Sequence, residues 1–450
     1  MASGRRQVDW QGGGALRLAS ACALWLAAAA LALALWGFAP ARAEAAAACG
    51  FQTGFGSYSA GNQPGACWRP YNDASPFNRK LPRGAPTMPG SAAMVSSLLA
   101  GGDITQLVVG DPQRDGGVPI YWSQPTDPVY TLDCTKPWKD CKLEGLQIRV
   151  PAAAMPTGGF AAPGPTDHDA HLTVIDQQSG WEYDMWNVTG KTGSTITFGW
   201  GGRTRIDGDG LGSAAVAANY GSIAGPIRAE ELVAGKINHA LSMVVPCTDS
   251  AVYPATGTGA ECSKSGLPAS ASIPMGAHFQ LNMTRRAIRR LALPRWKQTI
   301  LVALSTYGAY VSDTTGVADQ WGFEKTAGEG YTSFGQPDPW VEWARSLGVV
   351  PEDFNSNGYE EYWFDMASDV PWQRLRIAGE CAAYGNCPPV SRAAKLKKRA
   401  RRCRQELARW NRSRDRSAAV RSTGRARRTR RTVARWDRRC DRLLRKARRA

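Results

Sequence analysis

The segment DHDAHLTVID, residues 167–176, places two of the chain's four histidines among three aspartates. If the segment is extended, its side chains alternate between two faces, and Asp167, Asp169, His171 and Thr173 share one of them. A carboxylate beside an imidazole raises its basicity and fixes its tautomer, which suits acid–base chemistry. The same atoms could instead bind a cation, although Asp-x-His is a weak metal motif. We therefore take Asp169 and His171 as candidate catalytic residues.

Other acids and histidines could complete a site with this segment. Glu231 lies on a short predicted helix just before His239, and Asp313 follows the apolar-aromatic run YGAYVS. His239 could be a base at the floor of a cleft, or a buried histidine that bonds the backbone. His278 shares its predicted strand face with two amides, which favours a solvated side chain. Glu231, His239 and Asp313 join the candidate catalytic set.

Tryptophans and an arginine indicate what such a site would bind. Fourteen of the 17 Trp lie outside the first 43 residues. Indole faces stack on sugar rings and carboxylates bond sugar hydroxyls, but large aromatics also fill β-rich cores. We predict Arg228, Asp184 and Trp186 as substrate-binding residues. The sequence contains no G-x-S-x-G, H-E-x-x-H or P-loop motif, and we assign no cofactor or metal.

The elements that must position these residues are mostly short strands. The link QQSG between two of them predicts a tight hairpin. Helical periodicity over 228–234 and 295–308, each ending at a Gly, predicts two inserted helices. The sequence thus predicts a mainly-β fold, a β-sandwich or jelly roll with a few inserted helices. The expected strands are 104–109, 146–150, 171–176, 181–188, 194–200, 236–245 and 277–283.

The N-terminal region predicts export. Arginines precede an apolar run over 19–38 that ends at a small-residue site, which is typical of a signal peptide over 1–43. An uncleaved membrane anchor is the alternative, because the run is long enough to span a bilayer. Residues 44–66 are expected to form an irregular lead-in and 67–390 a β-rich secreted domain. We expect a secreted protein without a lipid anchor, free or associated with the cell wall.

Cysteine usage agrees with an oxidising compartment. Ten of the 11 cysteines lie outside the predicted signal peptide, and an even count in a secreted chain favours disulfides over metal binding. Sequential pairing is the simplest of many connectivities. It would join Cys49 to Cys67, Cys134 to Cys141, Cys247 to Cys262, Cys381 to Cys387 and Cys403 to Cys440.

The net charge of +17 is concentrated at the C-terminus. Residues 392–450 carry 26 Lys or Arg and four Asp or Glu, hence +22, and the first 43 residues carry +3, which leaves −8 for the rest. Narrow apolar stripes predict two helices that fold into a basic helical hairpin over 391–450, with Cys403 opposite Cys440. Arginine pairs with phosphate and carboxylate, so a cell-wall polymer or nucleic acid is the expected partner of this tail. The alternative is a hairpin folded against the acidic body.

A longer stretch resembles a known group of proteins. The run DAHLTVID…WEYDMW…GPIRAEELVAGKINHALSM…MGAHFQLN…LVALSTYGAYVSDT, with SPFNRKLP before it, is similar to a family of secreted bacterial proteins for which no reaction is established. The resemblance covers roughly 70–320, excludes the tail, and breaks at His278. It implies that the matching residues belong to one module, namely Asp169, His171, Asp176, Arg228, Glu231, Gly235, His239 and Asp313.

The predicted function is action on an extracellular or cell-wall polysaccharide. In a hydrolase, one carboxylic acid protonates the leaving oxygen and another is nucleophile or base; we assign these roles to Glu231 and Asp313, with Asp169 in reserve. In a lyase, His171 or His239 would take a proton beside a uronate, whose carboxylate Arg228 would neutralise. The alternatives are a non-catalytic carbohydrate- or wall-binding protein and a structural exoprotein.

Overall fold

The described residues belong to the second of two compact units, Cys49–Ala450. The predicted signal peptide and Asp167 lie outside them. Among the described residues, no helix is both long enough and apolar enough to cross a membrane. The computed structural model describes residues 49–446 except 83, 113–115, 137, 139–140, 162–168, 265–271, 318–319, 354–355, 357, 388–391, 419–433 and 443–444.

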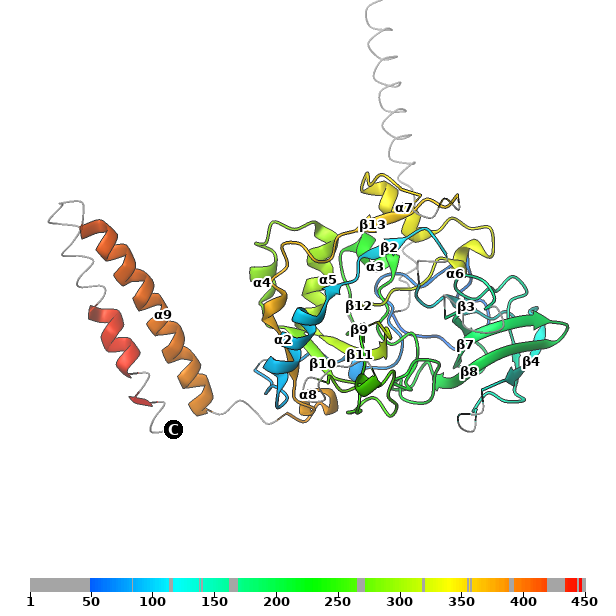
Figure 1. Cartoon of the computed structure of the whole chain (residues 1–450), viewed down its shortest axis with the longest axis horizontal. Coiled ribbons are helices and arrows are strands. Elements are labelled where there is room, and N and C mark those ends of the chain that lie inside the picture. The colour runs from blue at the N-terminus through cyan, green and yellow to red at the C-terminus, as the bar shows by residue number, and fades with distance from the viewer. Residues whose placement is uncertain are drawn as a thin grey trace, which may run out of the picture. The chain divides into compact units, whose positions relative to one another are not determined.

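The first of two large sheets has six strands in the order β1-β12-β9-β11-β10-β14 (Figure 1). Its central strands, β9 and β11, are parallel, whereas β12 and β10 run antiparallel to them. Apolar side chains on β9 and β11 are buried, as expected for strands in the middle of a covered sheet. The strands are β1 Asp103–Ile104, β9 Leu241–Val245, β10 His278–Leu281, β11 Ala309–Thr314, β12 Gln320–Phe323 and β14 Leu375–Ala378.

The second sheet also has six strands, in the order β3-β6-β7-β8-β4-β5. Its long central hairpin, β7 and β8, is prominent in Figure 1. On β7, Tyr183 and Met185 face an apolar core, whereas Glu182, Asp184 and Trp186 alternate onto the opposite face. The strands are β3 Ile120–Trp122, β4 Val129–Cys134, β5 Gln147–Arg149, β6 Leu172–Asp176, β7 Trp181–Thr192 and β8 Thr195–Arg205.

A third, two-stranded sheet and several helices complete the body. Strands β2, Leu107–Val109, and β13, Tyr362–Phe364, pair antiparallel. At the start of helix α3 the Glu231 carboxylate accepts a hydrogen bond of 3.1 Å from the backbone N–H of Arg228, and the helix ends at Gly235, whose φ of +70° suits glycine. The helices are α2 Ser91–Gly101, α3 Ala229–Ala234, α4 Arg285–Ile288, α5 Arg295–Thr306, α6 Glu329–Thr332, α7 Pro339–Ser346 and α8 Cys381–Tyr384, with 3-10 turns η1 Pro76–Asn78, η2 Cys262–Lys264 and η4 Trp372–Arg374.

The sheet-rich body expected from the sequence is confirmed at this level. The predicted hairpin joins β6 to β7, and α3 and α5 match the two predicted helices. The prediction of a strand over 236–245 is partly wrong, because β9 begins only at Leu241. Within the described part of the chain, four strand pairs are parallel, namely β1–β12, β9–β11, β3–β6 and β4–β8, and nothing in the sequence pattern indicated them.

All five predicted disulfides are present: Cys49–Cys67, Cys134–Cys141, Cys247–Cys262, Cys381–Cys387 and Cys403–Cys440. The last of them joins helix α9, Arg392–Ala418, to a helical segment over 434–442. The predicted linker between these helices lies outside the described residues. The disulfides fit an extracellular protein.

Candidate functional site

An aromatic platform lies on the second sheet. Trp186 on β7 pairs across the strands with Trp200 on β8. Trp138 stacks on Trp186 with ring centroids 5.5 Å apart, and its ring lies 6.0 Å from that of Trp200. Trp138 is 58% exposed. These three residues, the Trp platform, offer an aromatic face to solvent.

Local sequence explains how the platform forms. Trp138 sits in the loop that the Cys134–Cys141 disulfide closes. A Cβ atom at Gly199 would lie 3.1 Å from the Trp186 ring, so glycine leaves room for the indole. The platform therefore depends on a short cross-linked loop and a small residue on the neighbouring strand.

The predicted Asp-x-His pair lies at this platform. Trp186 Nε1 donates a hydrogen bond of 2.9 Å to Asp169 Oδ1, and His171 Nε2 lies 3.9 Å from Asp169 Oδ2. The Asp169 side chain is 72% exposed, whereas that of His171 is 13% exposed. Between them, Ala170 adopts a φ of +46°. Asp169 is thus an accessible carboxylate fixed beside an aromatic surface.

Asp313 is a partly buried carboxyl group on β11, next to an irregularity in the pairing with β9. It accepts hydrogen bonds from the backbone N–H groups of Ala217 at 3.0 Å and Thr314 at 2.7 Å. Burial raises the pKa of Asp313 to about 7, with a further contribution from the negative charge of Glu324 and a smaller one from Asp169. Asp313 therefore lies within electrostatic reach of the platform acid, and its pKa suits proton transfer near neutral pH.

Glu324 is a candidate that sequence reasoning missed. Ser312 Oγ donates to Glu324 Oε2 at 2.8 Å, and Ser242 Oγ contacts both Ser312 Oγ, at 2.6 Å, and the same carboxylate oxygen. These residues come from β9, β11 and the end of β12, which are far apart in sequence. No local motif marks Glu324, so only the strand pairing shows it beside Asp313.

Three other predicted residues form a separate, buried network. His239 Nε2 lies 2.9 Å from Glu231 Oε1, and its Nδ1 lies 2.8 Å from the Ala240 carbonyl oxygen. Arg228 contacts Glu231 Oε1 at 3.3 Å and donates to the Trp68 carbonyl at 2.6 Å. Their exposures are 5% for Arg228, 0% for Glu231 and 2% for His239. The network ties α3 to the N-terminal segment.

Electrostatics in this network favour ionised groups. Burial acts to raise the pKa of Glu231, but the charges of His239 and Arg228 outweigh it, and the pKa lies below its usual value. Both nitrogens of His239 face oxygen atoms. Among the described residues, no hydrogen bond or ion pair joins His239 to His171. The arrangement explains how α3 is held better than it explains catalysis.

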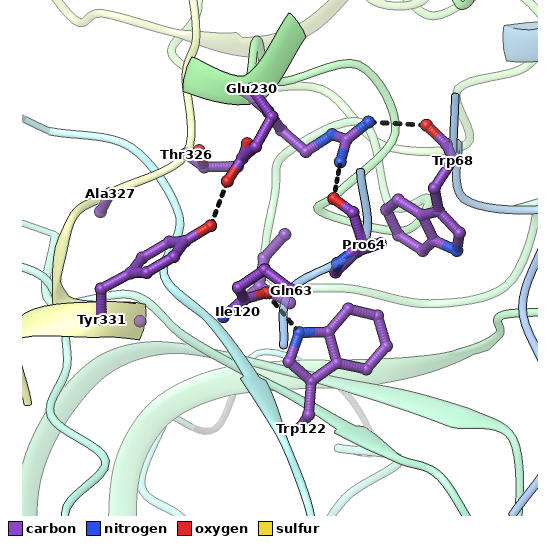
Figure 2. Close-up of a pocket in the computed structure, with 11 residues that line it drawn as sticks. Gln63, Pro64, Trp68, Ile120, Trp122, Glu230, Thr326, Ala327 and Tyr331 are labelled. Atoms are coloured by element: carbon purple, nitrogen blue, oxygen red, sulfur yellow. Dashed lines mark hydrogen bonds between the residues drawn. The ribbon is translucent and has the colours of Figure 1, made fainter. Parts of the chain in front are cut away.

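A small pocket borders this network (Figure 2). Its volume is about 20 Å³, room for roughly one water molecule. In Figure 2, Tyr331 hydrogen-bonds Glu230 on one side, and Trp122 Nε1 donates to Gln63 Oε1 at 2.7 Å on another. The pocket is too small for a sugar, so the network has no substrate-sized opening here.

Asp184, predicted to bind substrate, is instead part of a buried acid pair with Glu182. Both are fully buried, and they share a side-chain hydrogen bond. Tyr71 donates to Glu182 at 2.6 Å and Thr173 to Asp184 at 2.7 Å. Burial, and then the charge of Asp184, raises the pKa of Glu182 well above its usual value, whereas burial raises the pKa of Asp184 to about 6. Burial of the two neighbouring acids therefore favours the protonated form of the pair.

The prediction of a solvated His278 is wrong. It is 4% exposed, its Nε2 bonds the Tyr307 carbonyl at 2.7 Å, and its ring stacks on Tyr310 at 4.0 Å. Burial lowers the pKa of His278 to about 4. The sequence could not show that β11 and β14 flank β10 on both sides.

The contacts group the predicted site residues into three sets. The first set lies at the platform and contains Asp169, His171 and Trp186, with Asp313 close enough to be affected by the Asp169 charge. The second set is the buried network of Arg228, Glu231 and His239. The third is the acid pair, which includes Asp184. Among the described residues, no group of three or more His, Cys, Asp or Glu is placed to hold a metal ion.

Comparison of the chain with protein-family models, curated proteins and solved structures finds no match. The function must therefore be argued from the site.

Proposed function

We propose that the protein is secreted and binds an extracellular polysaccharide at the Trp platform. The observation that carries the proposal is the exposed Trp138–Trp186–Trp200 stack hydrogen-bonded to Asp169. Indole faces bind the apolar faces of sugar rings, and a neighbouring carboxylate accepts bonds from hydroxyls. The platform brings both groups together from three segments: the β7–β8 hairpin, the Cys134–Cys141 loop and the residues just before β6.

The chemistry that fits this site best is hydrolysis. Asp313 would protonate the leaving oxygen, because a pKa of about 7 keeps it largely protonated at slightly acidic pH. Asp169, exposed beside the platform, would act as the second carboxylate, with His171 next to it. We give Asp313 and Asp169 preference over Glu231, which is fully buried and ion-paired.

Non-catalytic binding is the second candidate, and it requires only the platform and Asp169. A screen of soluble polysaccharides and isolated cell walls separates the two. Hydrolysis produces new reducing ends that Asp313→Asn reduces about 100-fold or more while binding persists. Binding without reducing ends or unsaturated products in the wild type leaves binding alone as the function.

Trp138→Ala tests the proposal itself. We expect polysaccharide affinity to fall roughly tenfold, about 1.4 kcal/mol, with unchanged thermal unfolding. The matched control is Tyr384→Ala. Tyr384 lies in α8, is 49% exposed, and stacks on Tyr253 with ring centroids 4.1 Å apart. If both variants bind as the wild type does, the Trp platform is not the binding surface.

We further propose that the body is a β-sandwich variant and that the tail is a disulfide-stapled hairpin that binds polyanions. The Cys403–Cys440 bond and the two helical segments it joins support the hairpin. A charge of +22 over residues 392–450 supports anionic wall polymers or nucleic acid as partners. Association with the cell wall would follow from either surface.

A further inference from the structure

A groove lies between β1, β2 and the end of β12, and none of the platform residues lines it. Its volume is about 760 Å³, which is in the range of sites for ligands of oligosaccharide size. It is lined by the consecutive residues 101–108, by Gly116, Gly117 and Gln320, and by residues 323–325 and Trp363. We call this cavity the β1 groove.

Glycines keep main-chain groups open to the β1 groove. A Cβ atom at Gly117, whose φ is +93°, would lie 2.3 Å from the Lys325 carbonyl oxygen. Glycine is therefore required for the close approach of the two segments here. Gly101, Gly102 and Gly116 also line the groove without side chains. At these positions the main chain itself forms part of the groove surface.

Several oxygen-bearing side chains line the groove. Asp103 and Gln320 are exposed, and Thr105 and Gln106 line the groove beside them. Gln106 Oε1 accepts a hydrogen bond of 2.9 Å from the Met366 N–H, which fixes its amide. Glu324 is held through one carboxylate oxygen by two serines. Two carboxylates, those of Asp103 and Glu324, thus line the groove.

Trp363 provides an aromatic face. Its neighbours on β13, Tyr362 and Phe364, are buried, so strand alternation turns Trp363 outward, where it is 36% exposed. Its Nε1 donates to Glu361 Oε2 at 3.2 Å, which orients the indole. An oriented, exposed ring at a polar groove is suited to stacking on a sugar ring.

The charges of the groove exclude one class of sugar. Among the described residues that line it, Lys325 alone carries a positive side chain. That side chain is buried, with its ammonium 5.4 Å from the Trp340 ring centroid. A uronate or sulfated sugar would meet Asp103 and Glu324 without an accessible cation, and like charges in a partly closed site are unfavourable.

We propose that the β1 groove binds a neutral or amine-bearing oligosaccharide, with Trp363 stacked on one sugar ring and Asp103 and Glu324 bonded to hydroxyl or ammonium groups. The site stands apart from the Trp platform, so the chain would hold a polysaccharide at two places. The proposal requires neither catalysis nor binding at the platform.

Calorimetric titration of the full chain tests the groove, with a glucosamine tetrasaccharide and its N-acetylated form as probes. We expect binding to the wild type and to the control variant Tyr384→Ala, roughly tenfold weaker binding to Trp363→Ala, and a smaller loss for Gln320→Ala. Asp103→Asn should weaken the glucosamine form more than the N-acetylated form. Gln320 and Asp103 are exposed, so these variants remain informative if Trp363→Ala destabilises the fold.

Four outcomes would overturn the proposal. In the first, both probes bind as tightly as to the wild type in all three groove variants, namely Trp363→Ala, Gln320→Ala and Asp103→Asn. In the second, a galacturonate tetramer binds and its affinity also falls in Trp363→Ala. The dependence on Trp363 distinguishes binding in the groove from attraction of the acidic sugar to the basic tail. A lysine tripeptide could displace both sugars from a Trp363-dependent site, which would make the groove a peptide site. Loss of binding in Trp138→Ala alone would support the platform and count against the groove.

Discussion

Buried acids in this protein are accommodated in two ways. Glu231 stays ionised because Arg228 and His239 surround it, whereas Glu182 and Asp313 keep protons because burial and neighbouring carboxylates act on them. Only Asp313 of these is partly exposed. A neutral acid within reach of solvent is the one that can transfer its proton to a substrate.

The protonation of Asp313 predicts the pH dependence of any hydrolysis. Its pKa is raised to about 7, so the protonated, active form is lost as pH rises through that value. We expect kcat/KM to fall about tenfold per pH unit above pH 7 and to be pH-independent just below it. Reducing-end assays from pH 5 to 9 measure this limb. A limb that persists unchanged in residual activity of Asp313→Asn would assign it to another group.

The Glu182–Asp184 pair predicts how stability changes with pH. Both pKa values are raised on folding, so the folded state binds more protons than the unfolded one. The pair's contribution is therefore fully present below the unfolded carboxyl pKa of about 4 and is lost as pH rises through about 6 and beyond.

Glu182→Gln should remove part of this dependence while retaining a donor towards Asp184. We expect the free energy of unfolding to decline less between pH 5 and 8 in the variant than in the wild type, by denaturant titration. Asp103→Asn, at an exposed acid in β1, is the control and should follow the wild type. A parallel decline in all three proteins would show that the pair does not titrate in this range.

Part of the site could be predicted from single residues. Alternation predicted that Asp169 and His171 lie on the same side, and the structure places them 3.9 Å apart, with Asp169 bonded to Trp186 of β7. The segment is not a regular strand here, because Ala170 has a φ of +46° and β6 begins only at Leu172. Trp138 and Glu324 could not be found in this way. Their neighbours come from other strands, and cross-strand register is not encoded within one short segment.

At the scale of elements, alternation and turn chemistry predicted β6, β7, β8 and α3 well. The strand predicted to include His239 began too early, because residues 236–240 use their polar groups for a buried network and not for sheet pairing. Parallel pairing between β9 and β11 joins segments more than 60 residues apart. Periodicity reports which side of a strand is apolar and says nothing about its partner.

The Cys134–Cys141 loop makes a prediction about the Trp platform. The disulfide closes a short loop around Trp138, which limits how far its ring can move from Trp186. The double variant Cys134→Ser/Cys141→Ser should weaken polysaccharide binding roughly fivefold. Without the cross-link the loop is more flexible, and fixing the Trp138 ring on the ligand then costs additional conformational entropy. Calorimetric titration measures the effect.

The matched control for that loop is Cys381→Ser/Cys387→Ser, which opens a loop of similar length in and after α8. It should leave polysaccharide affinity unchanged. Equal losses in the two double variants would trace the effect to general destabilisation. No loss in either would show that Trp138 keeps its position without the cross-link.

At the scale of the whole molecule, charge is divided along the chain. The acidic part, residues 44–391, carries −8 and the tail, residues 392–450, carries +22, so the body cannot neutralise the tail. On α9, Cys403 is buried while Arg401, Arg402 and Arg404 are exposed. Most of the positive charge therefore remains available to an external polyanion.

Replacing Arg401, Arg402 and Arg404 with Gln should weaken attachment to isolated cell walls without changing the fold, because all three side chains are exposed. Each arginine that binds the wall displaces counterions from the anionic polymer. Removing one such arginine should therefore reduce the magnitude of the slope of log affinity against log salt concentration by about 1. Co-sedimentation at several salt concentrations measures the slope.

Truncation after Val390 should remove the remaining salt-dependent attachment and leave the thermal unfolding of the body unchanged. If the truncated chain sediments with walls as fully as the intact protein at low salt, the body binds the wall by itself and the tail serves another partner.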